Sequence, residues 1–172
     1  MGRFRHNEKR PRLVGARLRE DDFENLLALR RDPQVAAWLG GIPTGDHVRR
    51  RPAAFLEHWK RYGYGLWVLR RQQDDAFIGY VGLRRVTFDG RCEVELLYAL
   101  APGNRRQGLA SEATRAVAAL AFERLGLESI VAWTPPANRA SQRVMAKTGL
   151  VHGGLLNGLY RLRNRRTRHP PA

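Results

Sequence analysis

The stretch LLYALAPGNRRQGLAS, residues 96–111, decides the fold because it joins an apolar strand to a long helix through a cationic loop. The first amides of a helix lack internal acceptors and carry the positive end of its dipole. Small residues at Gly108 and Ala110 let a diphosphate approach those amides closely, and Arg105 and Arg106 add positive charge. The spacing is neither a Walker loop nor the dinucleotide fingerprint. On the residues alone two interpretations stay open, a phosphate site or an ordinary loop in which glycine makes a tight turn.

Alternating helices and strands extend outward from this stretch in both directions. Apolar runs bounded by turn residues predict strands at 13–18, 66–69, 77–83, 92–100, 129–133 and 155–162. Helical spacing of apolar residues, together with capping residues, predicts helices at 21–30, 33–39, 46–62, 108–125 and 138–148. The order βαα(α)βββαβαβ predicts an α/β fold with a mixed sheet and helices on both faces.

The composition fits a single globular domain. A chain of 172 residues is long enough for one domain, and 43% hydrophobic residues are enough to bury a core. No stretch free of Asp, Glu, Lys and Arg exceeds 13 residues, whereas a membrane-spanning helix needs about 20 apolar residues. The single Cys92 excludes an internal disulfide, and the histidines show no metal-ligand spacing. We therefore expect a soluble, cytoplasmic protein with no membrane contact and no metal.

Much of the net charge of +15 lies near the two ends of the chain. Residues 1–12 hold five cationic residues against one acid, and residues 161–172 hold five arginines and no acid. We expect a flexible basic N-terminal arm over 1–12, a single domain over 13–160 and a basic C-terminal tail over 161–172. These arms are suited to a polyanion such as RNA or the ribosome. The alternative is a GC-rich genome that encodes arginine for nearly every surface cation, and both interpretations stay open.

Several motifs resemble those of the GNAT superfamily of N-acetyltransferases. They are Arg105-x-x-Gly108-x-Ala110 after a hydrophobic strand, Asn138-x-x-Ser141 and Gly149-Leu150. The segments Leu18–Asp22, Asp32–Val35 and Trp38–Gly41 are similar to the branch that acetylates the N-termini of ribosomal proteins. The resemblance covers about residues 13–153, so that 13–160 would be an acetyltransferase domain. It implies a GNAT-like, mostly antiparallel sheet with a central splayed pair of parallel strands, at 92–100 and 129–133.

The resemblance further implies acetyl-CoA as cosubstrate, bound in the splay between those two strands. Backbone groups of Tyr98, Ala99 and Leu100 would pair with its pantetheine arm as a neighbouring strand would. The residues assigned to the diphosphate, by backbone amides or positive charge, are Arg105, Arg106, Gln107, Gly108, Leu109, Ala110 and Ser111. Asn138 matches a position that contacts the pantetheine, and it also suits a helix cap. Leu97 departs from the glycine usual in this branch, so we expect a different local bulge there.

Two residues are implied as catalytic groups by the same resemblance. Glu95 matches a common position of the general base, which acts through water; the alternative is a strand-face carboxylate paired with an arginine. Ser141 matches a serine that hydrogen-bonds the leaving sulfur; the alternative is a residue that supports the helix cap. Two departures matter here: Trp133 stands at another base position of some relatives, and Met145 replaces a proton-donating tyrosine.

These residues together predict an N-acetyltransferase in which a primary amine attacks acetyl-CoA directly in a ternary complex. An α-amine costs about 1 kcal/mol to deprotonate at pH 7, against about 4.6 kcal/mol for a lysine amine, so a modest base suffices. The resemblance to the branch that acetylates ribosomal proteins makes a protein N-terminal α-amine the first candidate acceptor. One alternative is a small-molecule amine, such as an antibiotic or a polyamine. Another is a nucleic-acid- or ribosome-binding protein that uses its basic arms. The sequence leaves the oligomeric state open.

Overall fold

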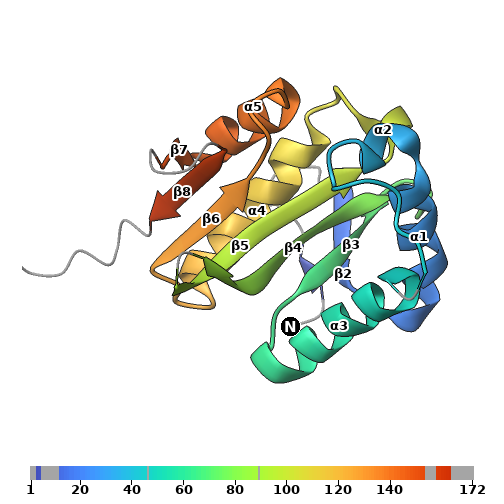
Figure 1. Ribbon diagram of the computed structural model, residues 1–172, viewed down its shortest axis with the longest axis horizontal. Coiled ribbons are helices and arrows are strands. Elements are labelled where there is room, and N and C mark those ends of the chain that lie inside the picture. The colour runs from blue at the N-terminus through green and yellow to red at the C-terminus, as the bar shows by residue number, and fades with distance from the viewer. Residues whose placement is uncertain (1–2, 5–11, 46, 89, 154–157, 164–172) are drawn as a thin grey trace, which may run out of the picture.

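One mixed sheet runs through the whole molecule (Figure 1). The computed structural model describes residues 3–4, 12–45, 47–88, 90–153 and 158–163. Within them the strands lie in the order β1-β2-β3-β4-β5-β6-β8-β7. Their bounds are β1 Arg3–Phe4, β2 Leu13–Arg17, β3 Leu66–Arg71, β4 Phe77–Phe88, β5 Arg91–Leu100, β6 Ser129–Trp133, β7 Val151–His152 and β8 Leu159–Arg163. Neighbouring strands are antiparallel except for β5 and β6, which are parallel.

Helices cover both faces of this sheet, as the element order predicts. The α-helices are α1 Phe23–Arg31, α2 Pro33–Ala36, α3 His47–Tyr62, α4 Leu109–Glu123 and α5 Arg139–Thr148, with 3₁₀ turns η1 at Glu20–Asp22 and η2 at Pro102–Asn104. Buried residues of α4 and α5 belong to one apolar cluster, whereas those of α1 and α2 belong to a second. Strand β3 separates the two, because Trp67 and Leu69 face the first cluster and Leu66 and Val68 face the second. None of the described helices is long and apolar enough to cross a membrane.

The parallel pair at the centre of the sheet is splayed, as expected. Strand β5 pairs with β4 over its whole length, from Arg91 to Leu100. Towards β6 its ladder is reduced to a single pair, Glu95 with Val131. The carboxyl-terminal half of β5 therefore has no described strand on its β6 side, and a gap opens there in the middle of the sheet.

Local sequence signals place the two helices that border this gap. Helix α4 begins after Gly108, whose φ of 79° lies in the left-handed region that glycine adopts without strain. Helix α5 begins after Asn138, whose side-chain oxygen accepts a hydrogen bond from the amide of Ser141 at 3.1 Å. Gly149 ends α5 in a left-handed conformation. The turn and cap residues thus fix where both helices start relative to the strand ends.

Some element boundaries differ from those predicted. Strand β4 extends to Phe88 rather than to residue 83, because it pairs with β5 along its full length. Helix α2 ends at Ala36 rather than at 39, and two left-handed glycines follow at 40 and 41. The short strand β7 has no periodic signal and was not predicted. The last strand begins at Leu159, and residues 154–157 of the predicted strand lie outside the described residues.

Some residues of the predicted arm over 1–12 and of the predicted tail from 161 are described and contact other elements. Arg3–Phe4 forms β1, which pairs with β2, and Arg12 bonds to Glu112 on α4. Strand β8 continues to Arg163, and Arg161 forms an ion pair of 2.6 Å with Glu93 on β5. Both arginines bind carboxylates on elements distant in the sequence, which a charge count along the chain does not show. The rest of the arm and of the tail lies outside the described residues.

Candidate active site

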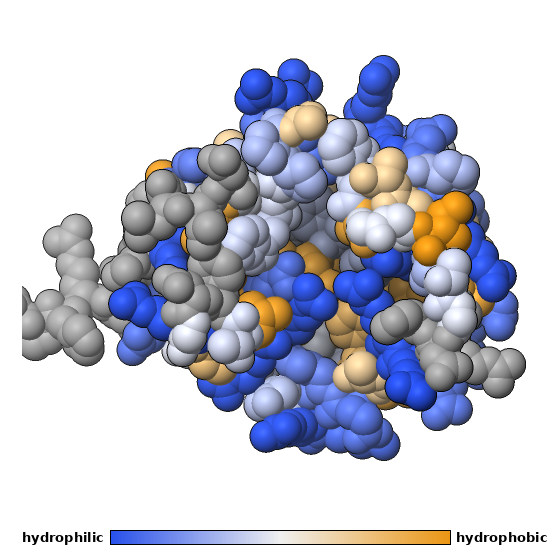
Figure 2. All heavy atoms as spheres, viewed as in Figure 1, coloured by the Kyte–Doolittle hydropathy of each residue, from blue (hydrophilic) through white to orange (hydrophobic). Residues whose placement is uncertain are grey.

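A cavity of about 940 Å³ opens where β5 and β6 separate. Figure 2 shows the surface hollowed near the middle of this face, with apolar surface inside and hydrophilic side chains around it. Residues of α1, α2 and α3 line the cavity together with residues of the start of α4 and of α5. Arg105, in the loop before α4, donates to the side chain of Gln34 on α2 at 3.4 Å. Of the residues predicted for the site, the cavity is lined by Glu95, Tyr98, Ala99, Leu100, Arg105, Arg106, Gly108, Leu109, Ala110, Ser111, Asn138 and Ser141.

Gln107 is the predicted site residue that does not line the cavity. Its carbonyl accepts a hydrogen bond of 2.8 Å from Arg12, and its side chain donates to the carbonyl of Gly103 at 3.2 Å. Neighbouring Arg106 and Gly108 both have positive φ, 61° and 79°. The loop therefore turns sharply into α4, and Gln107 stabilises the turn instead of facing the cavity.

The start of α4 offers open backbone to a ligand. A Cβ added at Gly108 would meet nothing within 4 Å except the end of the Arg12 side chain, at 3.6 Å. The space in front of the first helical amides is thus free of protein backbone, as close approach of a phosphate requires. Arg105 and Arg106, which precede the helix, line the same cavity and supply positive charge.

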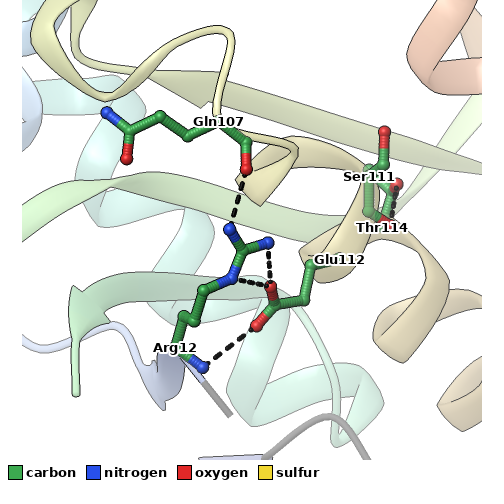
Figure 3. A network of polar contacts seen from close by, with 5 residues as sticks. All are labelled: Arg12, Gln107, Ser111, Glu112 and Thr114. Carbon is green, nitrogen blue, oxygen red and sulfur yellow. Dashed lines mark hydrogen bonds and ion pairs between the residues drawn. The ribbon is translucent and has the colours of Figure 1, made fainter. Parts of the chain in front are cut away.

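An acid buried in the first turns of α4 is neutralised from another part of the chain (Figure 3). Glu112 is only 3% exposed and accepts hydrogen bonds of 2.9 and 2.7 Å from the guanidinium of Arg12. The backbone amide of Arg12 donates to the same carboxylate at 3.3 Å. A bare carboxylate this close to a helix start would repel an anionic ligand. Arg12 therefore keeps this end of the cavity electropositive while it ties β2 to the loop.

Thr134 supplies a buried hydroxyl without a partner. Among the described residues, it has the one buried side-chain polar atom that makes no hydrogen bond, and the residue is 5% exposed. It follows β6 directly and lines the cavity. An unsatisfied buried hydroxyl costs about 1–3 kcal/mol, which a ligand amide or hydroxyl in the cavity would recover. The amide-rich pantetheine arm of acetyl-CoA fits this requirement. A polar residue just past the carboxyl end of a strand is the sequence signal that could have identified it.

Two hydroxyl groups meet between β5 and α5. The Tyr98 hydroxyl lies 2.7 Å from the Ser141 hydroxyl and 3.1 Å from the Ser141 carbonyl oxygen. Burial raises the pKa of Tyr98 to about 12, against a smaller lowering by its hydrogen bond to Ser141. The phenol therefore stays protonated at neutral pH. Sequence reasoning assigned Tyr98 for its backbone alone, because nothing in a single strand shows which residue of a distant helix it meets.

Glu95 has a feature expected of a carboxylate paired with an arginine and another expected of a general base. It is 8% exposed and bonds to Arg84 on the neighbouring strand β4, with a distance of 2.5 Å between Oε2 and Nε. This is the arginine pair that the structural interpretation expects. Glu95 also lines the cavity, as a base requires. Glu95 therefore binds Arg84 and faces the cavity at the same time.

The described residues contain no group of three His, Cys, Asp or Glu side chains that could hold a metal ion. The polar groups that line the cavity are instead hydroxyls, amides, one carboxylate and several cations. Such a set suits a ligand with phosphates and amides and an attack by a neutral nucleophile. The residues on the α4 side fit acetyl-CoA, because Gly108 leaves room at the helix start and Thr134 lacks a partner.

A comparison with protein families matches residues 12–151 to the family described as the acetyltransferase (GNAT) domain. A curated relative, the uncharacterised N-acetyltransferase YoaA of Bacillus subtilis, is 32% identical over 147 residues. That alignment covers 84% of this chain and 82% of the relative. The matched region contains the whole candidate site, from Arg12 to the end of α5.

Solved structures of acetyltransferases have the same fold. An acetyltransferase from Agrobacterium tumefaciens superposes with a TM-score of 0.82 at 25% identity, over 94% of each chain. A ribosomal-protein-S5-alanine acetyltransferase from Vibrio fischeri gives 0.77 at 18% identity, over 98% of this chain and 100% of the other. A spermidine N-acetyltransferase from Vibrio cholerae, solved with CoA and spermine, gives 0.73 at 17% identity, over 89% and 96%. The last two share the fold and differ in their named acceptors.

Proposed function

Because the chain belongs to the GNAT family of acetyltransferases, we propose that it transfers the acetyl group of acetyl-CoA to the N-terminal α-amine of a protein or peptide. The family membership gives the general activity, an acetyl-CoA-dependent N-acetyl transfer. The acceptor class is the part that we propose. It rests on the state of Glu95, the one carboxylate among the described cavity residues.

The ion pair between Glu95 and Arg84 supports an acceptor that loses its proton easily. Deprotonating an α-amine at pH 7 costs about 1 kcal/mol, whereas a lysine or polyamine nitrogen costs about 4–5 kcal/mol. A carboxylate that is bound to an arginine supplies little of the free energy needed to deprotonate a lysine or polyamine nitrogen. The V. fischeri fold neighbour, which is named for acetylation of a ribosomal protein at alanine, agrees with this choice. The fold neighbour named for spermidine acetylation makes a small polyamine the alternative acceptor.

The residues of the cavity divide the reaction between them. Acetyl-CoA, when bound, supplies the acetyl group as a thioester. The free backbone edge of β5 at Tyr98–Leu100 and the hydroxyl of Thr134 are suited to hold the pantetheine, and the first amides of α4 with Arg105 and Arg106 the diphosphate. Glu95 accepts the proton of the attacking amine through water. The paired hydroxyls of Tyr98 and Ser141 return a proton to the departing sulfur. Holding amine and thioester together supplies much of the rate.

Mass spectrometry of defined peptides tests this proposal. The substrate is a peptide with a free N-terminal alanine and one internal lysine, incubated with the protein and acetyl-CoA. We expect a single acetyl group, which fragmentation places on the N-terminal nitrogen. The same peptide with a blocked N-terminus is the control and should stay unmodified. Acetylation of the lysine, or of spermidine in preference to the peptide, would overturn the proposal in favour of a side-chain or polyamine acceptor.

A further inference from the structure

Three arginines converge in the cavity. Arg30 on α1, Arg51 on α3 and Arg84 on β4 come from three separate elements, and all line the same cavity. We call these three residues the arginine cluster. Glu95 is the single acid among the described residues that line the cavity, and its bond is to Arg84. The three positive charges of the arginine cluster thus face one negative charge.

Two members of the arginine cluster have no acidic partner within the described part of the chain. Arg30 donates to the carbonyl of Leu39 at 3.2 Å and hydrogen-bonds the buried Tyr80, both neutral groups. Arg51 takes part in no described ion pair. Its pKa is lowered from the ordinary value first by partial burial and then by Arg30 and Arg84. The guanidinium groups therefore lie close enough to repel one another, an arrangement that an anion between them would stabilise.

The arginine cluster is separate from the cations suited to acetyl-CoA. Arg105 and Arg106 precede α4, whereas Arg30 lies on α1, whose buried residues belong to the second apolar cluster. Arg51 lies on the part of α3 whose Phe55 and Leu56 pack against that same cluster. The walls around the arginine cluster, including Val35, Phe55 and Tyr80, belong to the second apolar cluster. Arg105 and Arg106 are the cations suited to the cosubstrate, whereas the arginine cluster contains Arg84, the partner of Glu95. The arginine cluster therefore lies beside the place proposed for the acceptor amine.

We propose that the arginine cluster binds a carboxylate of the acceptor, so that the preferred acceptor is an amine with a negative charge close to its reacting nitrogen. This inference rests on the proposed function. Glu95 and Arg51 line the same cavity, so one molecule bound there can place its amine at Glu95 and its carboxylate at Arg51. Polycationic acceptors are disfavoured, because a second ammonium would meet three guanidinium groups. The carboxylate belongs either to an acidic residue near a peptide N-terminus or to a free amino acid.

Matched acceptors test the charge preference directly. Three peptides carry alanine first and Asp, Asn or Lys second, with the same remaining sequence, and kcat/KM is measured from release of CoA. We expect kcat/KM to fall at least about tenfold from Asp to its neutral isostere Asn, and further to Lys. Alanine compared with alaninamide forms the second arm, and a preference for alanine there would identify the free amino acid as the source of the carboxylate. Equal kcat/KM across all acceptors overturns the inference.

Variants of the arginine cluster connect that preference to its residues. Arg51→Gln should reduce the Asp-to-Asn ratio towards one, and Arg51→Glu should make the Lys peptide the better acceptor. Arg31→Gln is the matched control, since Arg31 is exposed on the same helix as Arg30, lies outside the cavity lining and carries the same charge. A ratio that survives in Arg51→Gln and Arg51→Glu overturns the inference.

Thermal stabilisation by acetyl-CoA and acetyl transfer, measured together, distinguish failure of the proposed function from failure of the inference. Each variant must still be stabilised against heat by acetyl-CoA, which shows that it is folded and binds the cosubstrate. Transfer to none of the acceptors, with that stabilisation intact, would refute the proposed function and the inference with it. Transfer without any charge preference would refute the inference alone.

Discussion

Tyr98 illustrates how one side chain joins two elements of the site. Its hydroxyl forms a hydrogen bond with the hydroxyl of Ser141. Burial raises the pKa of Tyr98 to about 12. The protonated form is therefore favoured in the folded state. The resulting stabilisation is complete below the unfolded pKa near 10 and is lost as pH rises from there through 12.

We expect Tyr98→Phe to change both activity and the pH dependence of stability. Loss of the phenol should lower kcat about tenfold or more, because Ser141 loses the partner that orients it. Between pH 10 and 12 the wild type should lose up to about 2–3 kcal/mol of unfolding free energy that the variant does not lose. Denaturant titrations at pH 8 and pH 11.5 measure this difference. Parallel losses in both proteins would show that Tyr98 does not titrate as described.

Glu95→Gln tests the base directly. We expect kcat to fall by about 10²–10⁴ while acetyl-CoA still binds, and the loss should shrink at high pH, where the amine is already neutral. A pH–rate profile from pH 6 to 10, with binding of acetyl-CoA as the control, measures it. A loss independent of pH would instead mean that the carboxylate serves only to hold Arg84.

At this scale the sequence predicts some residues of the site and misses others for a physical reason. The turn at Gly108 and the helix cap at Asn138 were predictable, because turns and caps depend on residues adjacent in the chain. Thr134, Arg30 and Arg51 were not singled out, because their role arises from contacts between elements distant in sequence. The ion pair of Glu95 was foreseen as an alternative, but its partner Arg84 depends on the register between β4 and β5.

We expect cosubstrate binding to depend on helix α4 and the loop before it. Gly108→Glu would place a negative side chain at the start of α4, where only the end of the Arg12 side chain lies within 4 Å, at a φ of 79° that disfavours side chains. At 100 times its Kd a ligand adds about 2.7 kcal/mol of stability, and this variant should lose that gain. Thermal melting with and without acetyl-CoA measures it. Gly103→Glu is the matched control, because Gly103 lies in the same loop with nothing within 4 Å and a φ outside the left-handed region. Undiminished stabilisation in Gly108→Glu would show that the diphosphate lies elsewhere.

The link between Arg12 and Glu112 should affect stability and affinity together. Arg12→Gln leaves a buried carboxylate unpaired beside the start of α4. Because the Arg12 side chain is 52% exposed, we expect a modest loss of about 1–2 kcal/mol in unfolding free energy, together with weaker binding of acetyl-CoA. The double variant Arg12→Gln, Glu112→Gln removes the charge and should recover most of the affinity. If the double variant binds as weakly as the single one, charge is not the cause.

The order of the elements was largely predictable, whereas their ends were not. Strand β6 matches its predicted range, Ser129–Trp133, because turns bound it closely on both sides. Strand β4 runs five residues further than its apolar pattern, since pairing with β5 continues through Arg84–Phe88. Pairing between strands, which a pattern along one strand does not contain, sets these limits.

At the scale of the whole molecule, the charge beyond Arg163 is open to a separate test. Residues 164–172 contain Arg165, Arg166 and Arg168. Ending the chain after Arg163 keeps β8, and acetyl transfer to a short peptide should be unchanged. If the tail contacts RNA, we expect affinity for a generic RNA to fall and the slope of log K against log salt to flatten by about 0.7–0.9 per lost phosphate contact. Filter binding at several salt concentrations measures both. Unchanged affinity and slope would remove the tail from any RNA-binding role.

The separation of β5 from β6 has a consequence for how the molecule moves. On the open side of the single Glu95–Val131 pair, hydrogen bonds between the two halves of the sheet are replaced by a gap. Backbone amides that face the gap exchange their hydrogens with solvent until a bound molecule completes the ladder. Occupancy of the cavity should then protect residues on both sides of the gap at once and couple the opening of the two halves. If the cosubstrate binds along β5 as proposed, it would act as an additional strand, and its release would uncouple the two halves of the sheet.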